Sequence, residues 1–503
     1  MKNDFDEMFE IYYDAAIATS LSEILNYKDI SNSYYADEFL LNDVAYSKLK
    51  DKLFESVNTV GNSPCRFIIS LFYGNSFWSV GENSQTNQKL SELNEREIEL
   101  IYDYNNAITS VFSIEDAELG TISETDIDNL FQNDKINKER YYELSRSIYK
   151  EKNDIIAPIF VEMIGVRNEI AKENGYDNYA DYCYKELYSR FYTIEDISKL
   201  RSLVKSLFPD IISEISERIK PENIEKANKI CNEKYDNQRD ESVKALLSEI
   251  DENLVDSYDK MLKTHSCSLN ISENKADISF TTLIPIYDKP YLFASPVNES
   301  GLQNFSTIFH EFGHYYQFDL AVTDTILNDL DQNEVISQGL ELLASERFDK
   351  ITDEKSYNND IILDEILSIL QSIRDGFLFD EFQDLVYNEN DPTPDKINKI
   401  YAQLLNEYGI DYYKTDDNDA LSWIDINHNF ITPYYYISYA ESAIVALEIF
   451  TNDEPVQTFL QFADNSKELN FDKNCEKVGL KSPIEIDTLT NINKTIKERY
   501  IND

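Results

Sequence analysis

The stretch "STIFHEFGHYYQF", residues 306–318, holds two of the four histidines in the chain, set one helical turn apart with a glutamate between them. On a helix, positions i and i+4 lie on the same face, so His310 and His314 can present two imidazole nitrogens to one metal ion. Glu311 lies one residue further round, where it is placed to take a proton from water rather than to ligate. The stretch therefore predicts the zinc centre of an HExxH peptidase; the alternative is a short helix that carries two histidines without a metal.

A catalytic zinc ion needs a third protein ligand and an open fourth position. The pattern HExxHxxGxxH is excluded, because Gln317 and Leu320 stand where it has Gly and His. The segment "DQNEVISQGLELLASERF", residues 331–348, offers Glu334 at the start of a polar stripe on a predicted helix. We predict Glu334 as the third ligand, and a solvated helix face is the alternative interpretation. The stripe consists of Glu334, Ser337, Gln338, Glu341 and Ser345.

An aromatic cluster follows in "WIDINHNFITPYYYISYA", residues 423–440. A phenol or a neutral imidazole near zinc can donate a hydrogen bond to the oxyanion that forms when water attacks a peptide carbonyl. The chain has 35 tyrosines, so an aromatic cluster at helical spacing is also compatible with an ordinary core. The candidate donors are His428, Tyr434, Tyr435, Tyr436 and Tyr439.

The fold is predicted to be mainly helical. The chain has only 12 glycines and 12 prolines in 503 residues, and apolar residues recur at helical spacing over long segments. In residues 393–409, Thr393 is a candidate cap, Pro394 suits the first helical position and Gly409 ends the pattern.

One segment, "ADISFTTLIPIYDKPYLFASP" at residues 276–296, predicts a β-hairpin instead, because it is rich in β-branched and aromatic residues. A turn is expected at residues 288–290. The second strand, residues 291–295, is predicted to be an edge strand, because Pro296 suits the end of an edge strand better than a central one.

Composition excludes several classes of protein. With 94 acidic and 46 basic residues the formal charge is −48, which disfavours binding to nucleic acid or to anionic membranes. No run of about 18 apolar residues is present, and the acidic start lacks the basic and apolar regions of a signal peptide. Five scattered cysteines without a CxxC pair favour free thiols. We therefore expect a cytoplasmic protein that interacts with neither nucleic acid nor membrane.

Taken together, these stretches resemble the thimet oligopeptidase and oligoendopeptidase F family of zinc peptidases, and the oligoendopeptidase F branch more closely. "TIFHEFGHYYQ" resembles the active-site helix of the family, and "EVISQGLE" is similar to its third-ligand segment. "HNFITPYYYISYA" resembles the C-terminal histidine and tyrosine pattern. "RNEIAKENGYDNYADY", residues 167–182, is similar to a helix pair of the family.

The resemblance implies a helical, two-lobed peptidase with a deep channel and a small β-sheet beside the zinc helix. It implies an N-terminal helical region at residues 1–135 and a catalytic domain at residues 136–503. The hairpin is expected to supply the substrate-binding edge strand, and the expected reaction is hydrolysis of internal bonds in short peptides. The oligomeric state is not predicted.

The resemblance also assigns roles to residues. It implies that His310, His314 and Glu334 bind Zn²⁺ and that Glu311 is the general base. It implies that His428, Tyr435 and Tyr439 stabilise the transition state. Tyr436 is an alternative to Tyr435 in this role.

Two other functions remain open. One is a zinc carboxypeptidase or dipeptidase of a related helical HExxH family, which needs a basic residue for the substrate carboxylate. Arg347 and Arg374 are the only arginines in the motif region. The other is a catalytically silent peptide-binding protein, which the presence of Glu311 disfavours.

Overall fold

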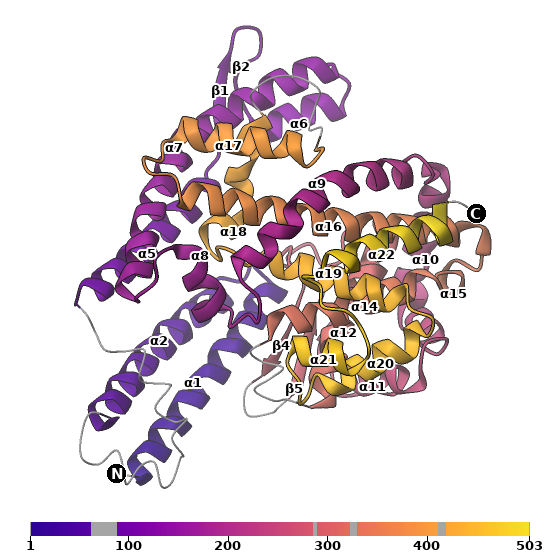
Figure 1. Ribbon diagram of the computed structural model, residues 1–503, viewed down its shortest axis with the longest axis horizontal. Helices are drawn as coiled ribbons and strands as arrows, with labels where there is room; N and C mark the ends of the chain where they lie inside the picture. Colours follow the sequence, from indigo (N-terminus) through magenta and orange to yellow (C-terminus); the bar gives the residue numbers. More distant parts are fainter. Residues whose placement is uncertain (1, 62–87, 285–288, 322–328, 411–418, 502–503) are drawn as a thin grey trace.

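The computed structural model describes residues 2–61, 88–284, 289–321, 329–410 and 419–501. Helices make up most of these residues, and the strands form two small sheets (Figure 1). The predicted fold class, mainly α with a small sheet beside the histidine helix, is confirmed.

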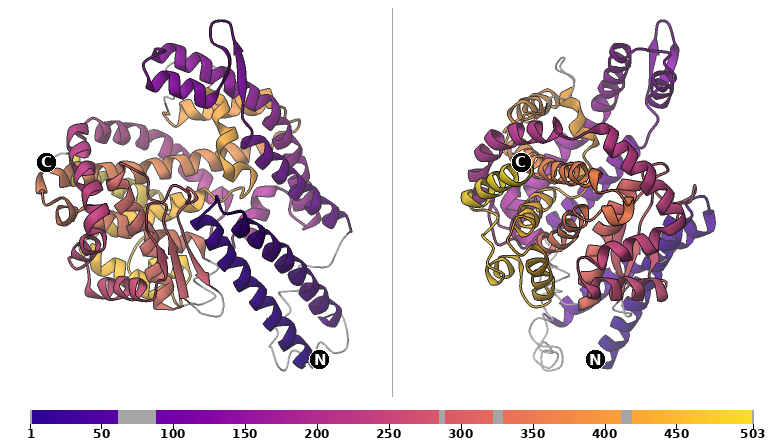
Figure 2. Two further views of the ribbon diagram at one scale, coloured as in Figure 1. Left: turned by 180° about the vertical axis from the view of Figure 1, so that it is seen from behind. Right: turned by 90° about the vertical axis from the view of Figure 1, so that its right-hand side faces the viewer.

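The first helices form a long hairpin that projects from the rest of the molecule (Figures 1 and 2). This hairpin has a small core of its own, built by Phe5, Leu53 and Val57. The elements of the N-terminal part are α1 (Lys2–Lys28), α2 (Ser33–Gly61), α5 (Gln88–Ile108), β1 (Ser113–Asp116), β2 (Gly120–Ser123), α6 (Glu124–Gln132) and α7 (Lys138–Glu173).

The middle of the chain supplies the second sheet and the helix that carries the two histidines. A π-helical turn, Cys183–Leu187, follows α8, and α12 follows the last strand directly. The elements are α8 (Tyr179–Tyr182), α9 (Ile194–Ser216), α10 (Pro221–Leu247), α11 (Glu252–Lys263), β3 (Cys267–Ser268), β4 (Phe280–Ile284), β5 (Lys289–Phe293) and α12 (Gly301–Leu320).

Helices and short helical turns are the regular elements of the C-terminal part in its described residues. As predicted, Thr393 caps α17 by accepting a hydrogen bond from the backbone of Lys396, and Pro394 is the first helical residue. The elements are α14 (Leu330–Ser345), α15 (Asp349–Thr352), α16 (Asn358–Tyr387), α17 (Pro394–Glu407), α18 (Asn427–Phe430), α19 (Ile437–Phe450), α20 (Pro455–Asn465), α21 (Phe471–Lys477) and α22 (Ile486–Ile496), with short 3₁₀ or π turns at Lys355–Tyr357, Asp419–Asp425 and Lys497–Ile501.

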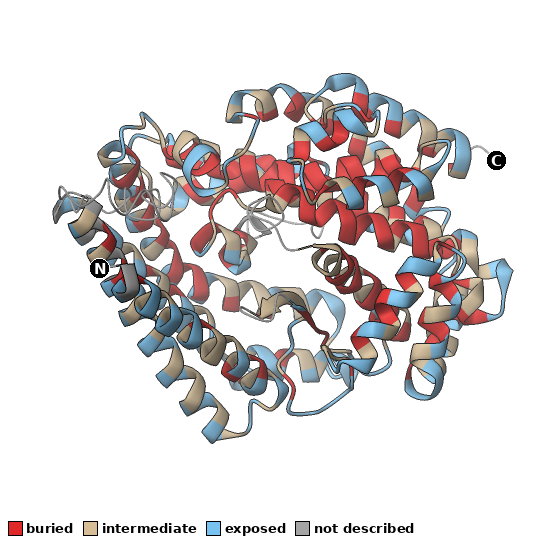
Figure 3. Ribbon diagram, turned by 90° about the horizontal axis from the view of Figure 1, so that it is seen from below, coloured by how far each residue is buried: buried red, intermediate tan, exposed pale blue. Residues whose placement is uncertain are grey.

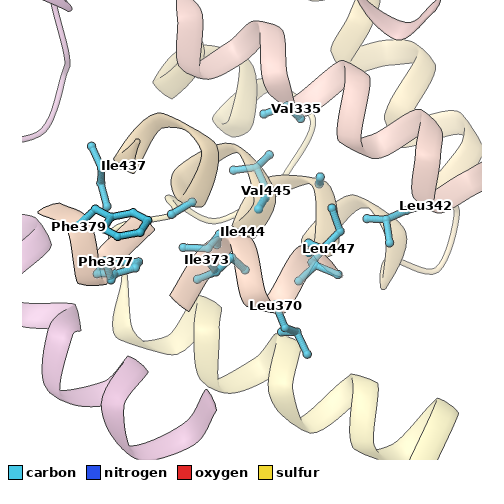
Figure 4. Close-up of a cluster of buried hydrophobic side chains, with 14 of the residues drawn as sticks. Val335, Leu342, Leu370, Ile373, Phe377, Phe379, Ile437, Ile444, Val445 and Leu447 are labelled. Carbon is cyan, nitrogen blue, oxygen red and sulfur yellow. The ribbon is translucent and has the colours of Figure 1, made fainter. Parts of the chain in front are cut away.

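Helices α14, α16 and α19 form the centre of the main hydrophobic core (Figure 4). Each of these helices contributes fully buried residues to the same cluster, for example Val335 from α14, Ile373 from α16 and Ile444 from α19. Buried residues run along the long central helices, whereas the projecting hairpin is mostly exposed (Figure 3). The polar stripe of α14 is therefore carried by a helix whose apolar residues lie in the main core.

The sheet beside α12 has the strand order β3-β5-β4, so β5 is its central strand. The prediction that residues 291–295 form an edge strand was wrong. The two-residue strand β3 pairs in parallel with β5, with Cys267 opposite Leu292, and covers the edge that the hairpin would have left open. The antiparallel partner β4 lies at the other side, with Thr281 opposite Leu292. Among the described residues, β3 and β4 each pair on one side only, and β4 is the longer of these two outer strands, which leaves it as the open edge of the hairpin.

The two faces of this sheet pack against different helices. Side chains alternate along a strand, and Thr281 reaches α12 while Phe280 and Ile284 pack toward α1. Tyr27 of α1 stacks edge-on against Phe280 at 5.7 Å. Figure 2 shows the strands lying beside α1. The sheet thus sits between the histidine helix and the N-terminal hairpin.

Four of the five cysteines lie in the described residues, and all four are free: Cys183, Cys231, Cys267 and Cys475. Cys65 and the predicted turn residue Asp288 lie outside the described residues. No helix of the described chain is long and apolar enough to cross a membrane.

Candidate active site

His310 and His314 on α12 meet Glu334 on α14. Glu334 Oε2 lies 3.6 Å from His310 Nε2 and 3.5 Å from His314 Nε2. The three ligand atoms all lie within 4.8 Å of one another. The structure therefore brings together the three residues that the sequence proposed as metal ligands.

The close contact between α12 and α14 places these side chains. At Gly313, between the two histidines, a Cβ atom would lie 2.6 Å from Cα and 3.0 Å from the backbone nitrogen of Ser337. Only glycine allows such an approach of one helix backbone to another. One of the two variable positions of the HExxH motif is thus fixed by packing in this chain.

The donor set fits a zinc ion. Two imidazole nitrogens and one carboxylate are the protein ligands of one class of catalytic zinc site. His310 Nδ1 lies 2.8 Å from Glu341 Oε2, so with a proton on Nδ1 the imidazole donates to Glu341 and keeps the lone pair of Nε2 free for a metal ion. Ser337 Oγ donates to Glu334 Oε2 over 3.1 Å. Hydrogen bonds from outside the donor set thus orient two of the three ligands.

The electrostatics of the cluster favour a cation. Burial lowers the pKa of His310, but Glu341, Glu334 and Glu311 outweigh burial and raise this pKa to about 10. Burial alone would raise the pKa of Glu334, yet His314 and His310 lower it to about 2. Three carboxylates around two imidazoles stabilise positive charge, and a divalent cation would supply it.

Glu311 lies in the same cluster without being one of the three converging groups. Its side chain is buried, and burial raises its pKa against the opposing effect of His310 and His314. Thr281 on β4 donates from Oγ1 to Glu311 Oε2 over 2.9 Å. The carboxylate is therefore held near β4, beside the face of α12 that carries His310 and His314.

The aromatic cluster assembles as a compact group of rings. His428 stacks on Tyr435 with ring centroids 5.4 Å apart, and Tyr439 lies 5.8 Å from His428 and 5.3 Å from Tyr435. Tyr436 also contacts His428, at 5.2 Å. Gln338 on α14 donates from Nε2 to the carbonyl of Tyr439 over 3.5 Å, so the cluster lies against the helix that carries Glu334. Tyr435 and Tyr439 can therefore act together.

The surroundings of these rings favour the neutral forms, which can donate hydrogen bonds. Burial, followed by the charge of Glu334, raises the pKa of Tyr435 and of Tyr439 far above the usual value for a phenol. Burial lowers the pKa of His428, which favours the neutral imidazole. His428 Nδ1 also contacts Thr432 Oγ1 at 2.6 Å, which fixes the orientation of its ring.

Tyr434 belongs to the core instead. It is fully buried, and its φ of 60° lies in the left-handed region that a bulky residue rarely adopts. Arg190 Nη2 donates to the carbonyl of Tyr434 and to Ser438 Oγ, both over 2.8 Å. Tyr188 donates to the carbonyl of Pro433 over 2.8 Å. The core interpretation thus holds for Tyr434, whose strained turn orients the tyrosines that follow.

A cavity of about 700 Å³ adjoins the cluster at Glu341. It lies between α10, α12, α14 and α16, and its wall includes Ser306, which donates to Glu341 over 3.0 Å. Three further carboxylates line it: Glu225, Asp364 and Glu365. The surroundings of the candidate metal site are therefore strongly acidic.

The sequence did not predict roles for Glu341 and Thr281. Glu341 follows Glu334 by two helical turns on the polar stripe, so the stripe contained a signal for it. Thr281 is one of two threonines in a strand, and no local pattern links it to a residue 30 positions away.

The comparison with protein families agrees with the site. Residues 183–457, more than half of the chain, match the sequence pattern of Peptidase family M3. This range contains every predicted site residue. The chain belongs to peptidase family M3. It is therefore a peptidase, and the predicted family is confirmed.

Solved structures share the fold of this M3 peptidase over nearly its whole length. A protein provisionally described as an oligoendopeptidase F has a TM-score of 0.72 and 16% identity, with 98% of this chain and 91% of that chain covered. PZ peptidase A, solved with an inhibitor, has a TM-score of 0.73 and 17% identity, with coverages of 97% and 92%. The oligoendopeptidase F of Enterococcus faecium has a TM-score of 0.62 and 12% identity, with coverages of 99% and 91%. No curated protein sequence matches this M3 peptidase.

Proposed function

We propose that this M3 peptidase is a zinc-dependent oligoendopeptidase that hydrolyses internal bonds of short peptides. The observation that carries the proposal is the convergence of His310, His314 and Glu334 within 4.8 Å. Glu311 and the ring cluster lie beside them, so a proton acceptor and hydrogen-bond donors flank a site suited to a metal ion.

In this proposal His310, His314 and Glu334 hold the zinc ion. Bound there, zinc supplies Lewis-acid chemistry, which polarises the peptide carbonyl and makes water more acidic. Glu311 accepts the proton of the attacking water and passes it to the leaving amine. The burial that raises the pKa of Glu311 suits a group that must both take and release a proton.

In this proposal the ring cluster stabilises the negative charge that develops on the carbonyl oxygen. Tyr435 and Tyr439 donate hydrogen bonds to the oxyanion, and neutral His428 adds a third donor or orients the two phenols. These donors are arranged before the substrate arrives, because the turn at Tyr434 is held by Arg190 and Tyr188. Preorganised donors cost no rearrangement in the transition state.

We assign peptide docking to the open edge of β4. An extended peptide can add to a sheet edge through backbone hydrogen bonds, with little demand on its sequence. Thr281 joins this strand to Glu311, so a peptide on β4 lies next to the proposed base. A peptide docked in this way continues past β4 in both directions, which favours cleavage at an internal bond.

The carboxypeptidase or dipeptidase alternative finds less support. The side chain of Arg347 donates to the carbonyl of Leu343 and contacts Glu346, and that of Arg374 contacts Asp375. Both guanidinium groups thus have local partners.

The free thiols support the proposal of a cytoplasmic enzyme, since reducing compartments keep cysteines unpaired.

The test is a panel of peptides of matched sequence with free or blocked termini, incubated with zinc-loaded enzyme. We expect cleavage at internal bonds whether or not the termini are blocked, and no cleavage of a stable folded domain carrying the same sequence. Cleavage that requires a free C-terminus would favour the carboxypeptidase alternative. Absence of bound zinc in protein purified without chelators, with no activity after zinc addition, would refute the proposal.

A further inference from the structure

The hydroxyl of Thr281 contacts Glu311 at two points. Thr281 Oγ1 lies 2.9 Å from the side-chain oxygen Oε2 and 2.8 Å from the backbone carbonyl oxygen of Glu311. A hydroxyl has one proton to donate, so the two oxygens share it or receive it in turn. Both contacts link the open edge strand β4 to the middle of α12.

Glu311 depends on this contact for its orientation. Among the described residues, Thr281 provides the only side-chain hydrogen bond to the Glu311 carboxylate. His310 and His314 act on it electrostatically, but in the proposed function their nitrogens point to the metal. A glutamate has several rotatable bonds, and a buried carboxylate without a donor is costly. The threonine hydroxyl therefore selects one carboxylate position among several.

We propose that Thr281 is the positioning residue for the general base, holding the Glu311 carboxylate in register with the strand on which the peptide docks. This inference rests on the proposed function, because it takes Glu311 as the base. It adds a role for the edge strand. Strand β4 then positions the base through its side chain as well as the substrate through its backbone.

The test compares Thr281→Val, which keeps the shape and removes the hydroxyl, with Thr281→Ser, which keeps the hydroxyl. We expect Thr281→Val to lower kcat about tenfold, the rate equivalent of one hydrogen bond, with KM changed less than twofold. Thr281→Ser should restore most of kcat. Thr282→Val is the matched control, because it removes a hydroxyl from the adjacent position whose side chain points to the opposite face of the sheet.

Bound zinc and the melting temperature are measured for each variant. These measurements distinguish a mispositioned Glu311 carboxylate from loss of zinc binding or of the fold. We expect one zinc per chain in all of them. If Thr281→Val fails to fold, Thr281→Ala replaces it, with the same expected loss of kcat and rescue by serine. A kcat loss in Thr282→Val as large as in Thr281→Val would overturn the inference, because the effect would then belong to the strand.

Comparison of Thr281→Val with Glu311→Gln separates this inference from the proposed function. We expect partial loss of kcat in Thr281→Val and complete loss of turnover in Glu311→Gln. An unchanged kcat in Thr281→Val, with Glu311→Gln inactive, would overturn the positioning role and leave the proposed function standing. Full activity of Glu311→Gln would overturn the proposed function itself.

Discussion

At the scale of the residue, two glutamates within reach of the same histidines differ in character. Opposing positive charge lowers the pKa of Glu334 to about 2, whereas burial raises that of Glu311. Glu334 faces the ring nitrogens of His310 and His314 directly, and Glu311 faces a neutral hydroxyl. A permanently ionised carboxylate suits a metal ligand, and one with a raised pKa suits a base.

The two glutamates should therefore respond differently to the same substitution. Glu311→Gln should retain one zinc per chain and lose turnover, because the ligands are kept and the base is removed. Glu334→Gln should weaken zinc binding, because an anionic ligand is lost. Zinc content after dialysis against a competing chelator, together with peptide turnover, measures both effects. If Glu334→Gln keeps full metal affinity while Glu341→Ala loses it, the third ligand is Glu341.

The phenols should act on the chemical step. Tyr435→Phe or Tyr439→Phe removes a donor to the oxyanion and keeps the ring, so kcat should fall about a hundredfold while KM changes little. Steady-state kinetics on a short blocked peptide gives both constants. An unchanged kcat in these variants, in Tyr436→Phe and in His428→Ala would show that the cluster is part of the hydrophobic core and has no catalytic role.

Local spacing made the residues of the histidine motif predictable. His310, Glu311 and His314 follow from helical geometry, and Glu334 from a polar stripe at the start of the next described helix. Thr281 could not be found in this way, because its contact with Glu311 depends on how a strand and a helix pack together. The burial of Tyr434 could not be predicted either, because the sequence does not distinguish which of three consecutive tyrosines packs into the core.

At the scale of the element, the metal site depends on the distance between α12 and α14. Gly313→Ala would push a methyl group against the backbone of Ser337, where the available distance is 2.6 Å. We expect a loss of about 1 to 3 kcal/mol in unfolding free energy, as for other overpacked sites, together with weaker zinc binding. Urea unfolding and a chelator competition measure the two effects.

A second glycine provides the control. A Cβ atom at Gly165, in α7, would have no heavy atom within 4 Å. Gly165→Ala should therefore leave zinc binding unchanged and raise stability by up to about 1 kcal/mol, because alanine favours a helix. Equal destabilisation by both substitutions would show that the contact at Gly313 is not what limits the site.

The sheet shows why element type was easier to predict than strand order. The hairpin was evident from β-branched residues, but its position in the sheet depended on β3, a strand of two residues that no sequence pattern marks. Pairing of Cys267 and Ser268 with β5 covers the outer edge of β5 and leaves only that of β4 open in the hairpin. The proposed docking strand changed accordingly.

At the scale of the whole molecule, charge should govern the encounter with substrates. The chain carries a formal charge of −48, and four carboxylates line the cavity beside the candidate site. For cationic peptides we expect kcat/KM to fall as salt shortens the Debye length from about 30 Å at 0.01 M to about 8 Å at 0.15 M ionic strength. A neutral peptide of the same length is the control, and an equal salt response of both would exclude steering by charge.

The helical character of the whole molecule was predictable because few glycines and prolines interrupt long amphipathic segments. Its arrangement was not, since α14, α16 and α19 pack together although loops and other helices separate them in sequence. The division of the chain at residue 135 stays a prediction. By packing, Leu100 and Tyr104 of α5 belong to the same core as α14 and α19.

The open edge of β4 also bears on how copies of this protein behave in concentrated solution. An unpaired strand edge offers its backbone groups to any extended chain, including the same strand of another copy, and many proteins protect such edges with charged residues. The five residues of β4, Phe-Thr-Thr-Leu-Ile, contain no charge. The shortness of the strand and the repulsion between copies that each carry a formal charge of −48 both oppose self-association. Salt weakens that repulsion, so low ionic strength is the condition under which a purified sample should stay dispersed.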